Sequence, residues 1–325
     1  MPEVAEVRII ADHLEKFLVG NQLVRIDALN ESFLEKRTKG LTNLALPQKV
    51  MKIGTKGKFC YMVLETSVIA IGFGMSGNIR VEPTEAYLTQ YNRNKEKPET
   101  AKEYLTHAML RLCYIECSEC SECSECSGRS DIMSLKRYIY YHDVRRFGFW
   151  HVITTQELDK KLEELGPDIL QQRELPIKDI VKRFRRYNNQ NICIVLMNGK
   201  TLSGIGNYIK SEILYRTRVA PLAQVSNISD AVLYQLYHEA SSVALQAYLE
   251  GGASLYTFTG LIGERSEYKE KLLVYNRDTD PQGHPVQRLQ TPDKRTTHWI
   301  PAIQWIGLKP QIIIFYAKDR PISRP

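Results

Sequence analysis

The start of the chain carries apolar residues at helical spacing. Val7, Ile10, Leu14 and Leu18 lie three or four positions apart, so one face of a helix would collect all four. Gly20 follows the last of them and is typical of a helix end. The pattern therefore predicts a leading helix whose apolar side packs against a core.

Between residues 20 and 150 this spacing gives way to short runs rich in β-branched and aromatic residues, separated by turn residues. Such runs predict the strands of an antiparallel sandwich or barrel. The polar stretch 91–103 predicts a solvated loop between two of them. The six runs read LVRIDAL, FCYMVLE, SVIAIGFG, NIRVEP, AMLRLCYIE and RYIYYHDV.

After Trp150 the helical spacing returns, and a Gly- and Ser-rich segment at 251–265 predicts a flexible stretch. Residues 272–300 are strand-like again, with a turn signal at DPQGHP. Helices are predicted at 156–165, 174–187 (basic and amphipathic), 189–198, 206–216 and 229–249.

The fold class predicted from these patterns is α+β. An N-terminal antiparallel β-sandwich with a leading helix precedes a helical domain and a small β-hairpin. We place these three parts at residues 1–150, 151–265 and 266–305, and we expect residues 306–325 to form a tail.

Composition narrows the function classes only a little. The 325 residues carry 44 Lys+Arg against 37 Asp+Glu, a net charge of +7 that permits a polyanionic partner without requiring one. No apolar run approaches the roughly 20 residues that span a bilayer, which excludes an integral membrane protein. The first residues, MPEVAEVRII, have acids where a secretory signal carries basic residues, so we expect an intracellular protein.

The second and third residues form a candidate reactive pair. If Met1 is removed, Pro2 presents a secondary amine at a helix start, where the helix dipole disfavours protonation. Such an amine can attack an electrophilic carbon and form a Schiff base, with Glu3 beside it as general acid. The alternative is that Pro-Glu is only a favourable helix start.

Four further residues are candidates for contact with a nucleic acid. Lys58 in TKGKF stands at a strand start, where it could contact a phosphate or transfer a proton. Met75, in the loop GFGMSGNIR, is typical of an apolar wedge between bases. Arg145 and Phe147, in HDVRRFGFW, combine a charge with a ring that can stack on a base. A solvated lysine and ordinary core packing with a surface arginine are the alternatives.

The segment GKTLSGIGNYIKSEILYR (199–216) is the most specific single motif. Gly204 and Gly206 come just before a helix that begins near Asn207. Backbone N–H groups exposed at such a helix start suit a phosphate, and two helices joined by a glycine turn suit a clamp on the DNA backbone. A helix–helix turn that needs glycine for its own geometry remains the alternative.

Taken together, these motifs resemble the formamidopyrimidine-DNA glycosylase/endonuclease VIII (Fpg/Nei) family of base-excision repair enzymes. MPEVAEV, TKGKF, GFGMSGNIR, DVRRFG, LGPD and SGIGNYIKSEILYR occur in one order at plausible spacings. The resemblance extends from Pro2 to about Gln304 and is far more specific than any one motif. It implies a helix-two-turn-helix in the helical domain.

The resemblance also implies a chemistry and its residues. Pro2 would attack C1′ of a damaged nucleotide while Glu3 protonates the sugar or the leaving base, and β- and then δ-elimination would cut the strand. Lys58 would contact the flanking phosphate and assist proton transfer, and Glu6 matches a second family acid. The enzyme would be a bifunctional DNA glycosylase/AP lyase that uses no cofactor.

Other residues would bind the damaged DNA. Asn207 and Arg295 would grip its backbone, and Met75, Arg145 and Phe147 match the family triad that fills the space left by the everted base. Residues 256–268 align weakly with the loop that covers this base. We expect a monomer that binds duplex, bubble or single-stranded DNA in the nucleus or another DNA-containing compartment, with no membrane partner.

The C-terminal hairpin resembles the branch of the family whose finger lacks zinc. Residues 272–304 contain no cysteine, and His284 and His298 cannot supply the roughly four ligands of a Zn²⁺ site. We therefore predict no metal here and expect packing to hold the hairpin, with Trp299 and Tyr275 contributing.

The remaining features leave two rival hypotheses open. Five of the seven cysteines fall within Cys113–Cys126, and the last four of them, Cys117 to Cys126, form a Ser-Glu-Cys repeat. This repeat predicts either a disordered acidic loop or a metal or redox site. A metal- or redox-responsive regulator is therefore one rival. The other is a catalytically impaired damaged-DNA-binding protein of the same fold, because Val4-Ala5 replaces the usual Gly-Pro or Leu-Pro between the two acids.

Overall fold

The structure is a computed structural model of the chain, and it describes residues 2–92, 99–116, 136–172, 174–253 and 268–308. The cysteine repeat at 117–126, the segment 256–267 and the tail from 309 lie outside the described residues. The chain divides into two compact units. The first comprises Met1–Pro2, Glu6–Lys161 and Ser254–Ser266, and the second comprises Glu3–Ala5, Leu162–Ala253 and Glu267–Pro325.

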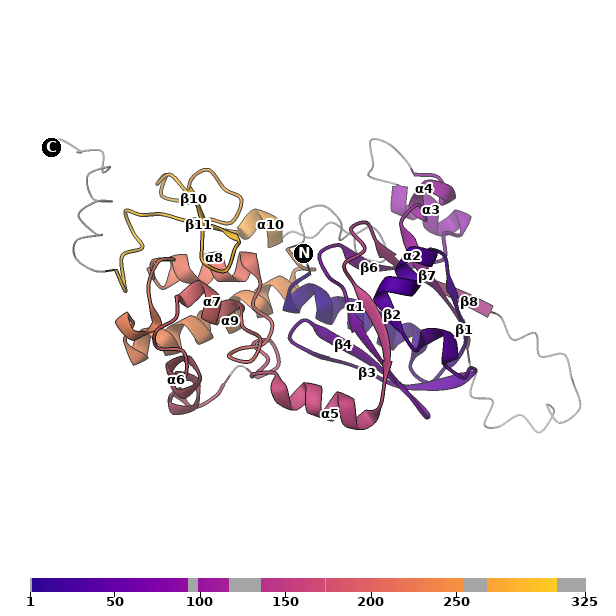
Figure 1. The fold of residues 1–325 in the computed structure, drawn as a ribbon. Helices are drawn as coiled ribbons and strands as arrows, with labels where there is room; N and C mark the ends of the chain where they lie inside the picture. The colour runs from indigo at the N-terminus through magenta and orange to yellow at the C-terminus, as the bar shows by residue number, and fades with distance from the viewer. Residues whose placement is uncertain (1, 93–98, 117–135, 173, 254–267, 309–325) are drawn as a thin grey trace, which may run out of the picture. The chain divides into compact units, whose positions relative to one another are not determined.

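Helices and strands follow the predicted α+β order (Figure 1). The helices are α1 (Val4–Leu18), α2 (Glu31–Arg37), α3 (Glu85–Asn92), α4 (Ala101–Tyr104), α5 (Thr155–Glu164), α6 (Ile177–Arg185), α7 (Ile192–Met197), α8 (Asn207–Arg216), α9 (Asp230–Leu249) and α10 (Tyr268–Lys271). The strands are β1 (Gln22–Ala28), β2 (Thr38–Lys39), β3 (Gln48–Lys56), β4 (Phe59–Leu64), β5 (Val68–Gly72), β6 (Gly77–Val81), β7 (Ala108–Ile115), β8 (Lys136–Asp143), β9 (Phe149–Ile153), β10 (Gln287–Gln290) and β11 (Thr296–Trp299).

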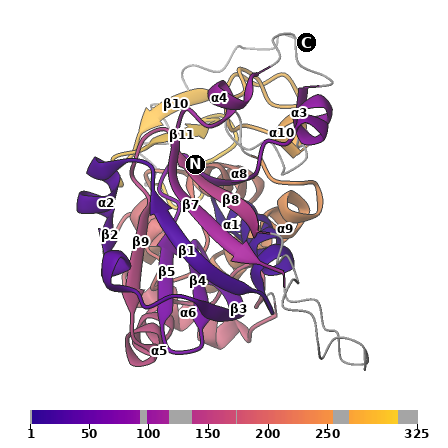
Figure 2. The ribbon, with the colours of Figure 1, turned by 90° about the vertical axis from the view of Figure 1, so that its right-hand side faces the viewer.

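In the first unit the strands β1–β9 pair in the order β2-β9-β5-β4-β3-β1-β7-β8-β6. All neighbours are antiparallel except β2 and β9. The pairing of β1 with β3 covers only Gln22↔Lys49 and Leu23↔Gln48, so the sheet is narrow at this join. Buried residues from the strands on both sides of the join form one core with the apolar face of α1. The predicted sandwich with a leading helix is confirmed, and β1, β7 and β8 lie side by side in Figure 2.

Short helices within the first unit were not predicted. The stretch 91–103, expected to be a loop, includes the end of α3 and the start of α4, where Thr100 and Glu103 form a reciprocal capping box. Asn30 accepts a hydrogen bond from the Phe33 backbone and begins α2. Such capping residues indicate helix starts from the sequence alone, but here they lie among strand-like runs and were overlooked.

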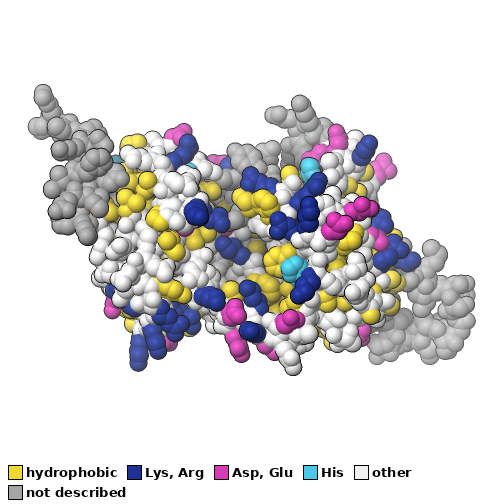
Figure 3. Space-filling view, viewed as in Figure 1, with side chains coloured by type: hydrophobic (Ala, Val, Ile, Leu, Met, Phe, Trp, Pro, Cys, Tyr) yellow, Lys and Arg dark blue, Asp and Glu magenta, His cyan; other side chains and the backbone are white. Residues whose placement is uncertain are grey.

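The second unit contains the helices α6–α10 and the hairpin of β10 and β11. Its core includes Val4 and Ala5 together with residues of α6 to α9. Within this unit the hairpin and α6 lie at opposite ends in both ribbon views (Figures 1 and 2). Basic side chains gather over α6 in Figure 3, where the exposed Lys178, Lys182 and Arg186 recur every four residues. Among the described residues, no helix is long and apolar enough to cross a membrane.

We expect acid to destabilise the first unit through His142. Burial, Arg80 and His107 lower the pKa of this imidazole to about 3, whereas an unfolded histidine titrates near about 6.5. The unfolded chain therefore binds a proton that the folded chain does not, and stability falls as the pH drops from about 6.5 toward 3, by about 1.4 kcal/mol per pH unit.

Urea unfolding of the wild type and of His142→Phe at pH values of about 7 and 5 checks this expectation. The variant should lose less stability than the wild type between the two pH values, whatever its stability at pH 7. Equal losses would assign the acid sensitivity to other groups.

Candidate active site and nucleic-acid interface

The carboxylate of Glu3 lies at the N-terminus of α8. Its oxygens accept hydrogen bonds from the backbone N–H groups of Gly206 (2.7 Å), Tyr208 (2.9 Å) and Ile209 (3.3 Å). The side chain is buried. Unpaired N–H groups and the helix dipole make a helix start favourable for an anion, so these donors fix an ionised carboxylate in one position.

The anion at this helix start is thus the protein's own acid. The sequence suggested that the two glycines expose these N–H groups to a phosphate, and the structure directs three of them to Glu3 instead. The structure also begins α1 at Val4, so Pro2 and Glu3 precede the helix. The backbone N–H of Val4 donates to the carbonyl of Gly204 at 3.3 Å, which ties this segment to the turn before α8.

Both positions of the turn require glycine, because Glu3 and Val4 approach them too closely to leave room for a Cβ atom. A Cβ on Gly206 would lie 2.2 Å from Cδ of Glu3, and one on Gly204 would lie 2.8 Å from Cβ of Val4. Gly204 also has a φ of +115°, which L-residues rarely adopt. Val4 and Ala5 are themselves buried in the core of the second unit. The unusual pair therefore packs as apolar core directly after Glu3.

Polar side chains of α8 hold the C-terminal segment. Lys210 Nζ lies 2.6 Å from Asp293 Oδ2 and is fully buried. The Ser211 hydroxyl accepts from the backbone N–H of His298 at 3.3 Å. One Glu212 oxygen, Oε1, accepts N–H bonds from three successive residues, Leu273, Val274 and Tyr275, at 2.9–3.1 Å. Packing alone does not hold the hairpin, although Trp299 is buried as predicted.

Three candidate residues gather around Tyr275 in the second unit. Burial is the largest cause of the raised pKa of Tyr275; the charge of Glu3 raises it further, whereas Asn207 and the charge of Arg295 lower it. Asn207 also donates to the carbonyl of Thr296 at 2.8 Å. Glu3, Asn207 and Arg295, which are far apart in sequence, thus share one neighbour.

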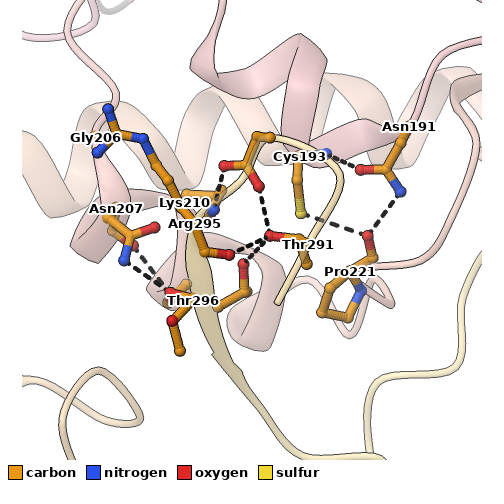
Figure 4. Close-up of polar contacts among 12 residues, drawn as sticks. Asn191, Cys193, Gly206, Asn207, Lys210, Pro221, Thr291, Arg295 and Thr296 are labelled. Carbon is orange, nitrogen blue, oxygen red and sulfur yellow. Dashed lines mark hydrogen bonds and ion pairs between the residues drawn. The ribbon is translucent and has the colours of Figure 1, made fainter. Parts of the chain in front are cut away.

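Figure 4 shows how the hairpin turn presents Arg295. The Thr291 hydroxyl bonds Asp293 Oδ1 at 2.5 Å, the Arg295 carbonyl at 2.9 Å and the Thr297 hydroxyl at 2.8 Å. In this view the Arg295 side chain extends from the turn toward the Gly206 end of α8. The backbone of Arg295 is held while its charged end points away from the turn.

In the first unit, the proposed wedge residues lie together. Nη1 of Arg145 is 3.4 Å from Sδ of Met75, and the half-exposed Phe147 ring has the Arg37 guanidinium 5.9 Å from its centre. Their two loops are joined by Asp143, whose buried carboxylate accepts from Ser76 Oγ at 2.5 Å and from the Gly148 N–H at 2.7 Å. It also accepts from the Arg145 N–H at 3.2 Å.

The other candidates of the first unit are placed by their elements. Lys58 is partly buried in the two-residue turn between β3 and β4, directly before the first residue of β4, as the motif predicted. Glu6 is fully buried in the first turn of α1. Pro2 is buried and stands two residues before this helix.

Several residues of the site were missed from the sequence. Asp143, Lys210 and Glu212 fall inside the quoted motifs without being singled out, and Asp293 falls in none of them, yet all four side chains are buried or nearly so. Their partners lie up to 83 positions away, so no local spacing identifies them. The one available signal was the succession of polar residues in NYIKSE, which has no continuous apolar face and so indicates polar neighbours.

The described residues give no sign of a metal or redox centre. No group of three or more His, Cys, Asp and Glu side chains among them is arranged to hold a metal ion. Burial raises the pKa values of Cys60 and Cys193 to about 12, which disfavours reactive thiolates. Cys113 is buried in β7, and the cysteine repeat at 117–126 lies outside the described residues.

Comparison with known proteins gives a consistent result across the chain. Residues 1–150 match the formamidopyrimidine-DNA glycosylase N-terminal domain, and residues 165–259 match the formamidopyrimidine-DNA glycosylase H2TH domain. A formamidopyrimidine-DNA glycosylase of Geobacillus kaustophilus is 24% identical over 318 residues, covering 94% of this chain and 100% of the relative. One from Yersinia pseudotuberculosis is 26% identical over 295 residues, covering 88% of this chain and 94% of the relative.

Solved structures share the fold. A complex of Lactococcus lactis Fpg with DNA containing an oxidised pyrimidine superposes with a TM-score of 0.70 at 20% identity, covering 93% of this chain and 99% of that one. The Fpg protein of Thermus thermophilus superposes with a TM-score of 0.71 at 21% identity, covering 94% and 100%.

The two matched domains and the shared fold place the protein in the class of DNA glycosylases of base-excision repair. The chain belongs to the Fpg/Nei family. Members of this family are DNA glycosylases with AP lyase activity, and DNA is their partner.

Proposed function

We propose that the protein is a bifunctional DNA glycosylase/AP lyase that excises oxidised bases, with Pro2 as its nucleophile. The observation that carries this proposal is the fixed carboxylate of Glu3, held by three N–H donors one residue after Pro2. A positioned acid/base group beside an amine is what Schiff-base chemistry at a sugar carbon requires.

The proposed reaction begins once Met1 has been removed. The Pro2 nitrogen bonds to C1′ of the damaged nucleotide as the bond from C1′ to the base breaks, and the departing base takes a proton from water. Glu3 takes the proton that the amine loses and passes it to the ring oxygen, which opens the sugar and leaves an iminium at C1′. The iminium acidifies C2′, so β-elimination and then δ-elimination release the two flanking phosphates.

Other residues act on the DNA in this proposal. Lys58 contacts the phosphate next to the lesion and assists proton transfer, and Glu6 supports the nucleophile as a second acid. Asn207 and Arg295 bind the backbone, while Met75, Arg145 and Phe147 fill the space of the everted base. The hairpin serves as a finger that needs no zinc, and the protein works in a DNA-containing compartment.

Borohydride trapping tests the chemistry. The wild type should give a covalent adduct with duplex DNA that carries an oxidised pyrimidine or an abasic site, because borohydride reduces the Schiff base. Pro2→Gly, or a protein with extra residues ahead of Pro2, should give no adduct while still binding the same DNA. Tight binding of abasic DNA without any adduct in the wild type would establish the catalytically impaired binding protein instead.

A further inference from the structure

The ion pair between Lys210 and Asp293 joins the helix that holds Glu3 to the tip of the hairpin. Lys210 stands in the first turn of α8, and its side chain has no exposed surface. Asp293 stands in the turn between β10 and β11 with 5% of its side chain exposed. The second carboxylate oxygen accepts from Thr291. Both charges are therefore enclosed, and each has a specific partner.

This contact is one of two that bracket Arg295. Asp293, two residues before it, is bound to Lys210, and the carbonyl of Thr296, one residue after it, is bound by the Asn207 side chain. Asn207 and Lys210 are three positions apart, so they lie on the same face of α8. Lys294, between the anchors, has a φ of +60°, which bends the backbone sharply.

A buried ion pair adds little to the free energy of unfolding, because desolvation of the two charges offsets most of their attraction. What the pair does is fix the relative position of two segments, since a buried charge can be paired only when its partner lies in one of very few places. In this turn the constrained position is that of the backbone just before Arg295.

We propose that Lys210 and Asp293 are positioning residues that hold Arg295 in register for a DNA phosphate. The proposal rests on the proposed function in taking Arg295 as a phosphate contact. Neither member of the pair touches DNA in this scheme. Their effect on binding passes through the Arg295 guanidinium, and removing the pair leaves that side chain present but misplaced.

Equilibrium binding to a duplex with a tetrahydrofuran abasic analogue tests the proposal, because no chemical step is involved. We would measure Kd between about 50 and 200 mM NaCl for Lys210→Met, Asp293→Leu, the double variant K210M/D293L and Arg295→Ala. Loss of one phosphate contact lowers the magnitude of the slope of log K against log salt by about 1. It should also weaken binding by about tenfold.

The double variant separates positioning from folding. Each single variant leaves a buried charge unpaired and is expected to lower Tm, whereas K210M/D293L leaves none and should melt close to the wild type. All three should nevertheless share the reduced salt slope of Arg295→Ala, and none should weaken binding further in the Arg295→Ala background. Leu214→Ala, a buried apolar change on the same helix, should lower Tm and leave the slope unchanged.

Two results would overturn the proposal. One is a wild-type slope in K210M/D293L, which would make the pair a stabilising contact only. The other is a further tenfold loss on top of Arg295→Ala, which would mean that the pair acts on DNA independently. Failure of borohydride trapping in the wild type would refute the proposed chemistry and would leave these binding results to decide the positioning role.

Discussion

Replacing Gly206 by alanine is expected to reduce base release by about 10²-fold or more while the protein stays folded. The backbone at this position has φ −120° and ψ −156°, an extended conformation that alanine adopts freely. The added Cβ would instead lie 2.2 Å from Cδ of Glu3 and 2.4 Å from one of its oxygens. The carboxylate must therefore leave its three donors, and the proton transfers assigned to it should fail.

Single-turnover base release and borohydride trapping measure this loss, with Tm as the check on folding. Gly199→Ala is the matched control from the same segment, because its Cβ would meet only Leu165 Cδ2 at an ordinary 3.6 Å. Glu3→Gln should resemble Gly206→Ala, and the double variant should be no slower than the worse single one. Wild-type turnover in Gly206→Ala would show that the observed position of Glu3 is not needed for the reaction.

Asp143→Ala is expected to destabilise the first unit by about 3–5 kcal/mol and to slow base release more than cleavage of abasic DNA. The carboxylate is fully buried and accepts from Ser76, Arg145 and Gly148. Removing it takes the acceptor from the Ser76 and Tyr141 hydroxyls and the Gly148 N–H, at about 1–3 kcal/mol each, whereas the Arg145 N–H keeps its bond to Ser76 Oγ. It also frees the two loops that carry Met75 and Phe147 from each other.

Denaturant unfolding gives the stability change, and paired assays on a damaged base and an abasic site give the selective effect. Met75→Ala is the companion variant: its side chain is exposed, so it should slow base release without the loss of stability. An abasic site has no base to evert, which is why its cleavage should suffer less. Equal slowing on both substrates would count against a wedge at these loops.

The helices and strands with a regular local pattern of apolar residues were predicted from the sequence. The helix expected at 206–216 is α8, and the one expected at 229–249 is α9. Six strand-like runs became strands of the first unit, because short runs rich in β-branched and aromatic residues favour strands. The strands β2, β3 and β9 were not predicted. β2 has only two residues, KVMKIGTK of β3 mixes lysines and a glycine with its apolar residues, and FWHVI of β9 is short.

Buried polar contacts could not be predicted in the same way. Lys210, Ser211 and Glu212 look like the solvated face of a helix, yet all three are fully buried because their partners come from residues 273–298. Glu3 illustrates the same limit: its position next to Pro2 was evident, but the three donors that fix it come from residues more than 200 positions away. The pairing of distant polar groups is a property of the folded chain.

Because α8 contacts both Glu3 and the C-terminal segment, partial unfolding of the second unit is costly. The N–H groups of Tyr208 and Ile209 donate to Glu3, while the side chains of Lys210 and Glu212 bind the hairpin tip and residues 273–275. A fluctuation that releases the hairpin would strip buried Lys210 and Glu212 of their partners, and that cost discourages partial opening. The carboxylate, the helix and the finger should therefore behave as one cooperative folding unit, protected from amide exchange together and lost together.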